Sequence, residues 1–114
     1  ERFTYDSFIK NTSICTSSMI IRRKKVGSAK FLKIVSCDDY FFKCKLLKNC
    51  GFAKNFGEKL TFYRISKNSV QSNKLKNMYS VWYINKRYNK MNFINNIFSL
   101  LSISFNSIKK YGFK

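Results

Sequence analysis

The first half of the chain has an apolar and polar pattern that predicts two helices. Residues 12–25 begin with hydroxyl side chains that can cap a helix, place Ile14 and Ile21 two turns apart on one face, and end in four basic residues. Cations are stabilised at the C-terminal end of a helix, because that end is its negative pole. We therefore expect a first helix over residues 12–25, ended by Gly27 and Ser28.

A second helix is expected from Ser36 to about Asn49. Ser36 can cap its start, and Asp39 stands three residues later, as in a capping box with Asp in place of Glu. Gly51 follows where a left-handed residue ends many helices, and Phe52 can fold back over that end. The apolar positions recur at helical spacing, at Tyr40, Phe41, Cys44 and Leu47.

Shorter apolar segments that are rich in β-branched and aromatic residues predict strands. They cover residues 31–35, 59–65, 70–78, 81–84 and 99–105, and a further helix is expected over residues 87–98. Helices and strands that follow one another in this order predict an α+β fold.

The chain of 114 residues is basic along its whole length. It has 23 Lys and Arg against 5 Asp and Glu, which gives a net charge of +18, while 45% hydrophobic residues supply material for a folded core. A compact body with this charge fits a polyanion, with nucleic acid as the first candidate and an anionic membrane surface as the second. Lys and Asn are abundant, Ala is rare and Pro is absent, as expected for a protein from an A/T-rich genome such as that of an organelle.

The chain contains no histidine, which removes the usual general base and the commonest zinc ligand. Among its five carboxylates only Asp38 and Asp39 are adjacent, and we interpret them as favourable negative charge at a helix N-terminus. The cysteines lack the spacing of a zinc-binding pair, although a metal site assembled through space stays an open alternative. These cysteines are Cys15, Cys37, Cys44 and Cys50.

Basic and aromatic residues are mixed in IIRRKK (residues 20–25) and in WYINKRYNK (residues 82–90). Cations on a fixed surface neutralise phosphates, and exposed aromatic rings stack on unpaired bases. The segment SISFNSIKK (residues 102–110) adds hydroxyl, amide and ammonium groups that can bond phosphates and base edges. We therefore favour contact with RNA or DNA, while most of the aromatic rings are expected in the core.

From Thr12 onward the chain resembles the small-subunit ribosomal protein eight family. TSICTSSMIIRR aligns with the first helix of that family, with Arg22 at the position of its second arginine. LLKNCGFAKNF resembles the end of the next helix, with Leu47, Gly51 and Phe52 in register, and LTFYR resembles the strand that follows.

The C-terminal part of the chain departs from this family pattern. The Ser-Thr-Ser-Lys-Gly motif of the family falls on residues 104–108, where only Ser104 is retained, although Lys109 and Lys110 follow at once. The closing segment of the family has no counterpart after Gly112. The resemblance therefore covers residues 12–106 and is strongest in the middle of the chain.

The resemblance implies a structural protein of a small ribosomal subunit, with no enzymatic activity and no cofactor. Its partners would be the central domain of small-subunit rRNA and neighbouring ribosomal proteins, with no small-molecule substrate and no membrane. The protein would have two small α/β lobes. After an N-terminal extension, residues 1–11, the first lobe would be a helix–strand–helix–strand–strand unit in residues 12–79, followed by a reduced strand and helix lobe in residues 80–114.

The expected RNA contacts combine the end of the first helix with a selective loop at residues 104–110. The residues expected to bind RNA are Arg22, Arg23, Lys24, Lys25, Lys30, Lys86, Arg87, Ser104, Phe105, Asn106, Ser107, Lys109 and Lys110. No secretory signal or presequence is visible. Together with the A/T bias, this favours a mitochondrial ribosome, with a plastid as the alternative.

Two other interpretations stay open. A basic protein could attach to a membrane surface or to another complex through residues 91–108, the longest uncharged stretch. Eight of these residues are Asn or Ser, which makes the stretch too polar for a stable membrane-spanning helix. A different ribosomal protein could share the same helix end by chance.

Overall fold

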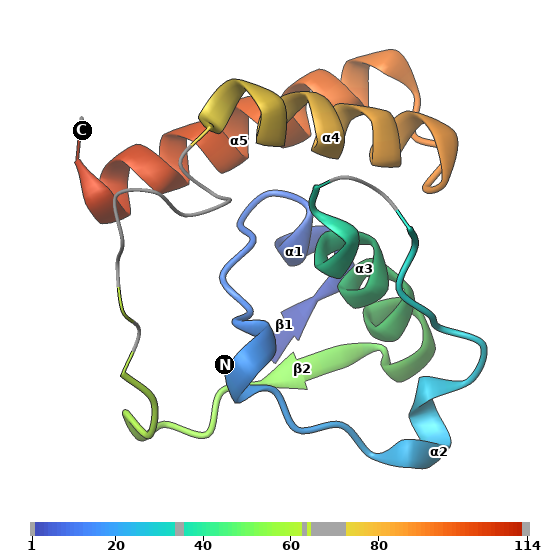
Figure 1. Cartoon of the computed structure of the whole chain (residues 1–114), viewed down its shortest axis with the longest axis vertical. Coiled ribbons are helices and arrows are strands. Elements are labelled where there is room, and N and C mark those ends of the chain that lie inside the picture. The colour runs from blue at the N-terminus through green and yellow to red at the C-terminus, as the bar shows by residue number, and fades with distance from the viewer. Residues whose placement is uncertain (1, 34–35, 63, 65–72, 113–114) are drawn as a thin grey trace.

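The computed structural model describes residues 2–33, 36–62, 64 and 73–112. Its elements are β1 (Arg2–Thr4), α1 (Tyr5–Phe8), the 3-10 helix η1 (Thr16–Ser18), α2 (Arg23–Val26), α3 (Asp38–Cys50), β2 (Phe52–Lys54), α4 (Lys74–Arg87) and α5 (Phe93–Tyr111). The fold is α+β, as predicted. Figure 1 shows α4 and α5 as one layer that covers α3, α1 and the sheet, and the molecule measures 38 × 35 × 27 Å.

Residues 2–11 belong to the packed body of the molecule. β1 pairs with β2 in a two-stranded antiparallel sheet, in which Thr4 lies opposite Phe52. Phe8 is 1% exposed, and its ring stacks on that of Tyr40 with 5.4 Å between centroids. The expected division into an extension, residues 1–11, and lobes 12–79 and 80–114 stays a prediction.

The end of the second predicted helix is confirmed. α3 runs to Cys50, and Gly51 follows with a φ of 83°, a backbone conformation in which glycine is favoured. The Gly51 N–H donates to the carbonyl of Leu47 at 2.8 Å and closes the helix. Phe52 does not fold back over this end as expected, because it begins β2 instead.

The start of α3 differs from the prediction. The N-cap residue is Cys37, whose φ of 61° is left-handed and whose side chain makes no capping bond. Ser36 donates to Oδ1 of Asn77 in α4 at 2.8 Å, so its hydroxyl is not available as a cap. The predicted capping box is therefore wrong, and the Asp39 carboxylate bonds to other side chains.

The helix predicted over residues 12–25 is wrong, because only η1 and α2 are helical in that segment. Its hydroxyl-rich start forms local bonds that compete with a continuous helix, as when Ser18 donates to the carbonyl of Cys15 at 3.4 Å. The cations at its end also lack compensating acids, since α2 contains three of them and no acidic residue.

None of the described residues in the five predicted strands lies in a strand. Residues 74–78 of the expected strand 70–78 lie in α4, as do residues 81–84. Residues 99–105 lie in α5. Residues 31–33, 59–62, 64 and 73 belong to no strand, and the rest of those predictions lies at residues 34–35, 63, 65 and 70–72, outside the described part. The helix expected over residues 87–98 is interrupted, because residues 88–92 form the turn between α4 and α5.

Asparagine caps explain why helices form in this half of the chain. The side chain of Asn73 accepts from the Lys76 N–H at 3.0 Å at the start of α4. Asn92 likewise accepts from the Asn95 N–H at 2.8 Å at the start of α5. A capped start on a long segment favours a helix over the short strands that aromatic and β-branched residues suggest locally.

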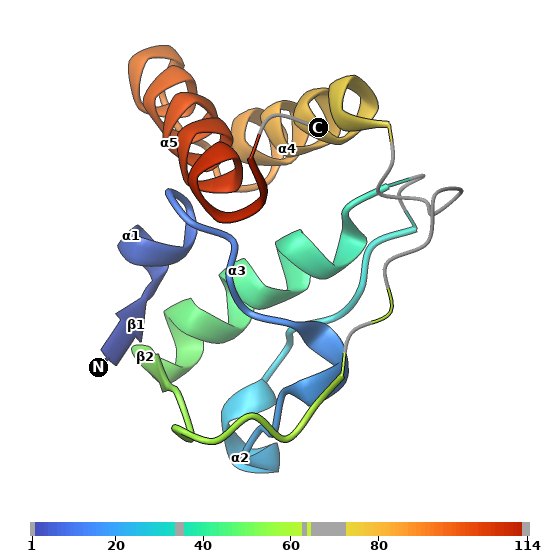
Figure 2. The same ribbon diagram turned by 90° about the vertical axis from the view of Figure 1, so that its left-hand side faces the viewer.

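The core is built around α3, seven of whose 13 residues are buried. Helices that are apolar on most sides lie at the centre of a fold, and Figure 2 shows α3 between the α4–α5 layer and α2. The larger buried cluster contains Phe8, Tyr40, Phe41, Cys44, Leu47, Val81 and Ile84. A smaller cluster on the side of α2 contains Ala29, Phe42 and Leu46.

Candidate functional site

The structure does not gather the residues that were expected to bind RNA. Arg22 to Lys25 lie at the start of α2 and within it, and Lys30 lies in the loop that follows. Lys86 and Arg87 end α4, and the remaining residues lie on α5. In Figures 1 and 2, α2 and α5 are at opposite ends of the molecule, so these cations do not form one continuous surface.

The selective loop that was expected at residues 104–110 is a helix. Ser104, Phe105, Asn106, Ser107, Lys109 and Lys110 all lie within α5. Asn106 donates to the carbonyl of Lys10 at 3.1 Å and to that of Ser102 at 3.0 Å. Its amide therefore holds α5 against the chain after α1, and the expected loop is wrong because the capped helix continues through it.

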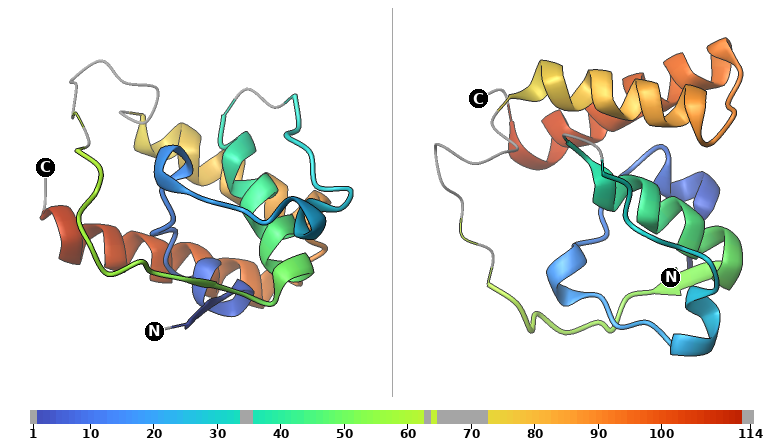
Figure 3. Two further views of the ribbon diagram at one scale, coloured as in Figure 1. Left: turned by 90° about the horizontal axis from the view of Figure 1, so that it is seen from below. Right: turned by 45° about the vertical axis from the view of Figure 1, so that its right-hand side comes forward.

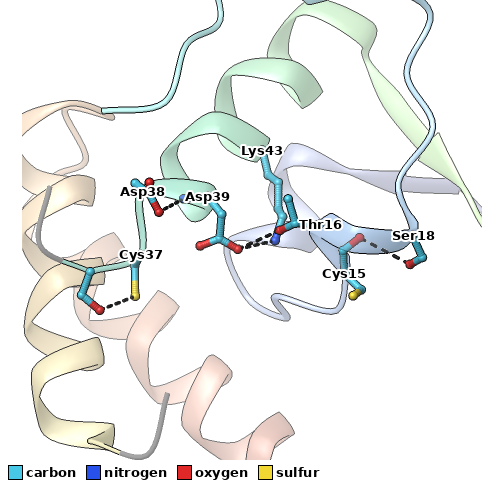
Figure 4. Close-up of polar contacts among 8 residues, drawn as sticks. Cys15, Thr16, Ser18, Cys37, Asp38, Asp39 and Lys43 are labelled. Carbon is cyan, nitrogen blue, oxygen red and sulfur yellow. Dashed lines mark hydrogen bonds and ion pairs between the residues drawn. The ribbon is translucent and has the colours of Figure 1, made fainter. Parts of the chain in front are cut away.

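A positioned carboxylate marks the N-terminal end of α3. Oδ2 of Asp39 accepts from Nζ of Lys43 at 2.7 Å and from Oγ1 of Thr16 at 3.0 Å. Figure 4 shows the three side chains converging from α3 and from η1. Lys43 is one helical turn after Asp39, so its spacing could have indicated the ion pair. Thr16 is 23 residues away, and no sequence pattern connected it to this site.

Opposing effects set the charge of Asp39. Burial raises the pKa of this carboxyl, but the hydrogen bond and charge of Lys43 and the bond from Thr16 outweigh it and hold the pKa below 3.8. The side chain of Asp39 is 36% exposed, whereas that of Lys43 is 7% exposed. Asp39 is therefore an ionised, oriented carboxylate that reaches solvent, and it is held by a buried cation.

A second carboxylate and a network of polar groups lie next to Asp39. Oδ1 of Asp38 accepts from the Asp39 N–H at 2.9 Å. On the other side, Ser36 and Cys37 both contact Asn77 of α4. The position predicted for Asp38 and Asp39, at a helix N-terminus, is confirmed, and their anionic form is favoured there.

Buried amides hold the α4–α5 layer against α3. The hydroxyl of Tyr40 donates to Oδ1 of Asn85 at 2.9 Å, and Nδ2 of Asn85 donates to Asn96 and Ser99 of α5 at 3.1 and 3.3 Å. Asn85 is fully buried and connects three helices. The network therefore fixes the position of α4, whose first turns contact the residues before Asp38.

The cysteines lie apart from one another, and all four are free thiols. Burial raises the pKa of Cys44 to about 11, and it also raises the pKa of Cys37. Cys15 is exposed on the loop before η1. Within the part of the chain that the structure describes, no group of three or more His, Cys, Asp or Glu side chains could hold a metal ion.

The helices of the described ranges include none with the length and apolar character needed to cross a membrane. No protein-family model matches the chain, and no solved structure matches it.

The chain is similar to TuaG of Bacillus subtilis (strain 168), whose name assigns it a glycosyltransferase role in teichuronic acid biosynthesis. The two sequences are 29% identical over 110 residues. The match covers 96% of this chain and 44% of TuaG, so the chain spans less than half of the length of this relative.

This similarity overturns the ribosomal interpretation. The resemblance to the ribosomal protein eight family is wrong, and so are a ribosomal function, a non-enzymatic role and the partners predicted from it, which were small-subunit rRNA and ribosomal proteins without a small-molecule substrate. The segment LLKNCGF misled because a helix that ends in glycine followed by an apolar residue is common to unrelated proteins. The similarity gives no specific support to the alternative of a basic peripheral protein, and localisation in a mitochondrion or plastid stays a prediction.

Proposed function

We propose that this chain is part of a glycosyltransferase, which moves a sugar from an activated donor to a hydroxyl group of an acceptor. The observation that carries the proposal is the similarity to TuaG along 96% of the chain. The net charge of +18 is also compatible with a donor whose leaving group contains phosphate, since a positively charged protein attracts such anions.

The reaction requires a base. An acceptor oxygen attacks the anomeric carbon of the donor sugar, the bond to the leaving group breaks, and the hydroxyl proton of the acceptor passes to a proton acceptor. Because the chain has no histidine, a carboxylate is the side chain best suited to this task.

Asp39 is the carboxylate that we assign as the base. Lys43 and Thr16 hold its Oδ2 atom, which orients the carboxylate and leaves Oδ1 outside these two bonds. Its lowered pKa keeps it ionised at neutral pH. A base with a low pKa takes the proton late in the reaction, when bonding to the anomeric carbon has made the hydroxyl acidic.

Asp38 is assigned a different role, because it is one residue nearer the start of α3 and lies outside the ion pair of Asp39. An ionised carboxylate accepts hydrogen bonds only, so it can bind the hydroxyl groups of a sugar. Asp38 would then orient the acceptor beside Asp39.

An activity assay tests these assignments. The purified protein is offered a panel of nucleotide-activated sugars, and release of the nucleotide is measured with and without acceptor sugars. Asp39→Asn should lower kcat by about 10²–10⁴-fold, the range typical of removing a general base. Asp38→Asn should mainly raise KM for the acceptor, because it removes a binding contact.

Asp6→Asn is the matched control, since Asp6 is an exposed aspartate on α1. It should keep the activity of the unmodified protein. Circular dichroism on each variant separates loss of catalysis from loss of folding. Full activity of Asp39→Asn would refute its role as base, and absence of transfer by the folded, unmodified protein with every donor would refute the assignment of catalysis to this part of the enzyme.

A further inference from the structure

The longest helix, α5, buries polar side chains and leaves many of its apolar side chains exposed. Its two most buried side chains are polar, because Asn96 and Ser99 are 1% and 2% exposed, and the partly buried Leu100 and Ile103 pack against the core beside them. Asn96 donates to the carbonyl of Trp82, and Ser99 donates to that of Ile9. A surface helix normally buries its apolar residues and exposes its polar ones, whereas α5 leaves a second group of apolar residues exposed, without a partner inside the described part of the chain.

The outward side of α5 is a continuous apolar stripe. At about 100° per residue, its six side chains fall within roughly one third of the helix circumference, opposite Asn96. They are between 37% and 69% exposed. This α5 outer face consists of Ile94, Ile97, Phe98, Leu101, Phe105 and Ile108. Figure 3 shows α5 on the outside of the molecule, away from α2 and β2.

The charge around this face has a single sign. Residues 74–111, which comprise α4, α5 and the turn between them, contain seven Lys or Arg and no Asp or Glu. Lys90 precedes α5, and Lys109 and Lys110 lie in its last turn. Lys109 follows Phe105 by one helical turn and therefore borders the apolar face.

We propose that the α5 outer face lies on an anionic lipid surface. Phe98, Leu101 and Phe105 enter the boundary between headgroups and acyl chains, and the lysines at both ends of α5 contact lipid phosphates. A helix of this kind lies in the plane of the interface, held by buried apolar area and by attraction to anionic lipids. This proposal departs from the first interpretation of the sequence, which expected no membrane partner, and takes up the alternative of attachment through residues 91–108.

Two observations favour lipid over a protein partner. None of the six side chains of the face has a polar atom, so nothing on it would fix the register of a partner protein, and a fluid lipid surface needs no register. The wholly cationic surroundings complement anionic headgroups. This proposal does not depend on glycosyl transfer, because it rests on α5 alone.

Vesicle flotation tests the proposal with the full chain and without any sugar substrate. We expect the protein to float with phosphatidylcholine vesicles that contain phosphatidylglycerol, and to bind vesicles of phosphatidylcholine alone at least about tenfold more weakly. Phe98→Ser combined with Phe105→Ser should lower binding to the anionic vesicles at least about tenfold. Lys109→Gln combined with Lys110→Gln should lower it by roughly tenfold.

Matched variants elsewhere on the surface control for composition. Phe56→Ser with Phe62→Ser removes two exposed rings outside α5, and Lys24→Gln with Lys25→Gln removes two charges from α2. Both should bind vesicles nearly as well as the unmodified protein, and all variants should keep its thermal midpoint. Equal losses in control and α5 variants, no binding to anionic vesicles, or a soluble dimer that covers α5 would each overturn the proposal.

Discussion

Asp39 connects the candidate chemistry with the stability of the fold. Its carboxylate offsets the charge of Lys43, which is nearly buried in α3. Removing the Asp39 carboxylate would leave that ammonium without its partner, at a cost of up to about 1 kcal/mol, since solvent screens the partly exposed Asp39. An activity assay on Asp39→Asn is therefore best run well below its unfolding temperature.

The same pair gives stability a defined dependence on pH. Because the pKa of Asp39 is below its ordinary value of 3.8 in the folded protein, its contribution is present above pH 3.8 and is lost as pH falls through the lowered pKa. Lys43→Met removes the partner and should weaken this acid-dependent loss. The effect should stay below about 1 kcal/mol, since solvent screens the partly exposed Asp39.

Urea unfolding at about pH 6 and about pH 3 measures this contribution. Lys45→Met is the control, because Lys45 is exposed on the same helix and does not contact Asp39. It should keep the acid dependence of the unmodified protein. Identical acid dependence in Lys43→Met and the unmodified protein would contradict the ion pair.

Sequence patterns located the two aspartates but not their partners. The expected cap at Ser36 placed a helix N-terminus at Asp38 and Asp39, where α3 does begin, although Ser36 is not the cap. The contact with Thr16 could not be predicted, since it joins two residues that are 23 positions apart in the sequence. The predicted helix over residues 12–25 would also have placed Thr16 differently. Sequence patterns describe residues that are close together in the chain, whereas this site is formed by residues that are far apart in the chain.

At the scale of helices and strands, prediction succeeded for α3 and failed for α5. Gly51 ends α3 by a backbone rule that needs no tertiary contact. In α5, alternating serine and apolar residues suggested a strand. The inward side combines hydrogen bonds from Asn96 and Ser99 with core contacts of the partly buried Leu100 and Ile103. A helix that buries polar groups has a periodicity that hydrophobic patterns do not reveal.

Asn85 should be the residue on which the joining of α3, α4 and α5 depends most. Asn85→Ala leaves the Tyr40 hydroxyl and the side chains of Asn96 and Ser99 without this partner in a buried region. We expect a loss of about 2–3 kcal/mol in the free energy of unfolding, measured by urea titration. Asn95→Ala, at an exposed position of α5, should stay within about 0.5 kcal/mol. Equal effects of the two variants would contradict this role.

At the scale of the whole molecule, the net charge is a poorer guide to the kind of partner than the positions of the charged residues are. The value of +18 suggested RNA, but the structure places α2 and α5 at opposite ends, so the cations of these two helices do not share one surface. Composition reports how many charges a chain has, and only the fold decides which of them share a surface. The same total charge is compatible with phosphate-containing donors and with lipid headgroups.

That excess charge should also limit stability in the absence of an anionic partner. With 23 cations against 5 anions, repulsion opposes the compact state, and salt should relieve it as the screening length falls from about 30 Å at 0.01 M to about 8 Å at 0.15 M. The thermal midpoint should rise with sodium chloride, by roughly 4–8 °C for each 1 kcal/mol of repulsion removed. Sucrose, which is uncharged, controls for general solute effects. A midpoint that stays constant or falls with salt would mean that local ion pairing, and not overall repulsion, dominates the electrostatics of this fold.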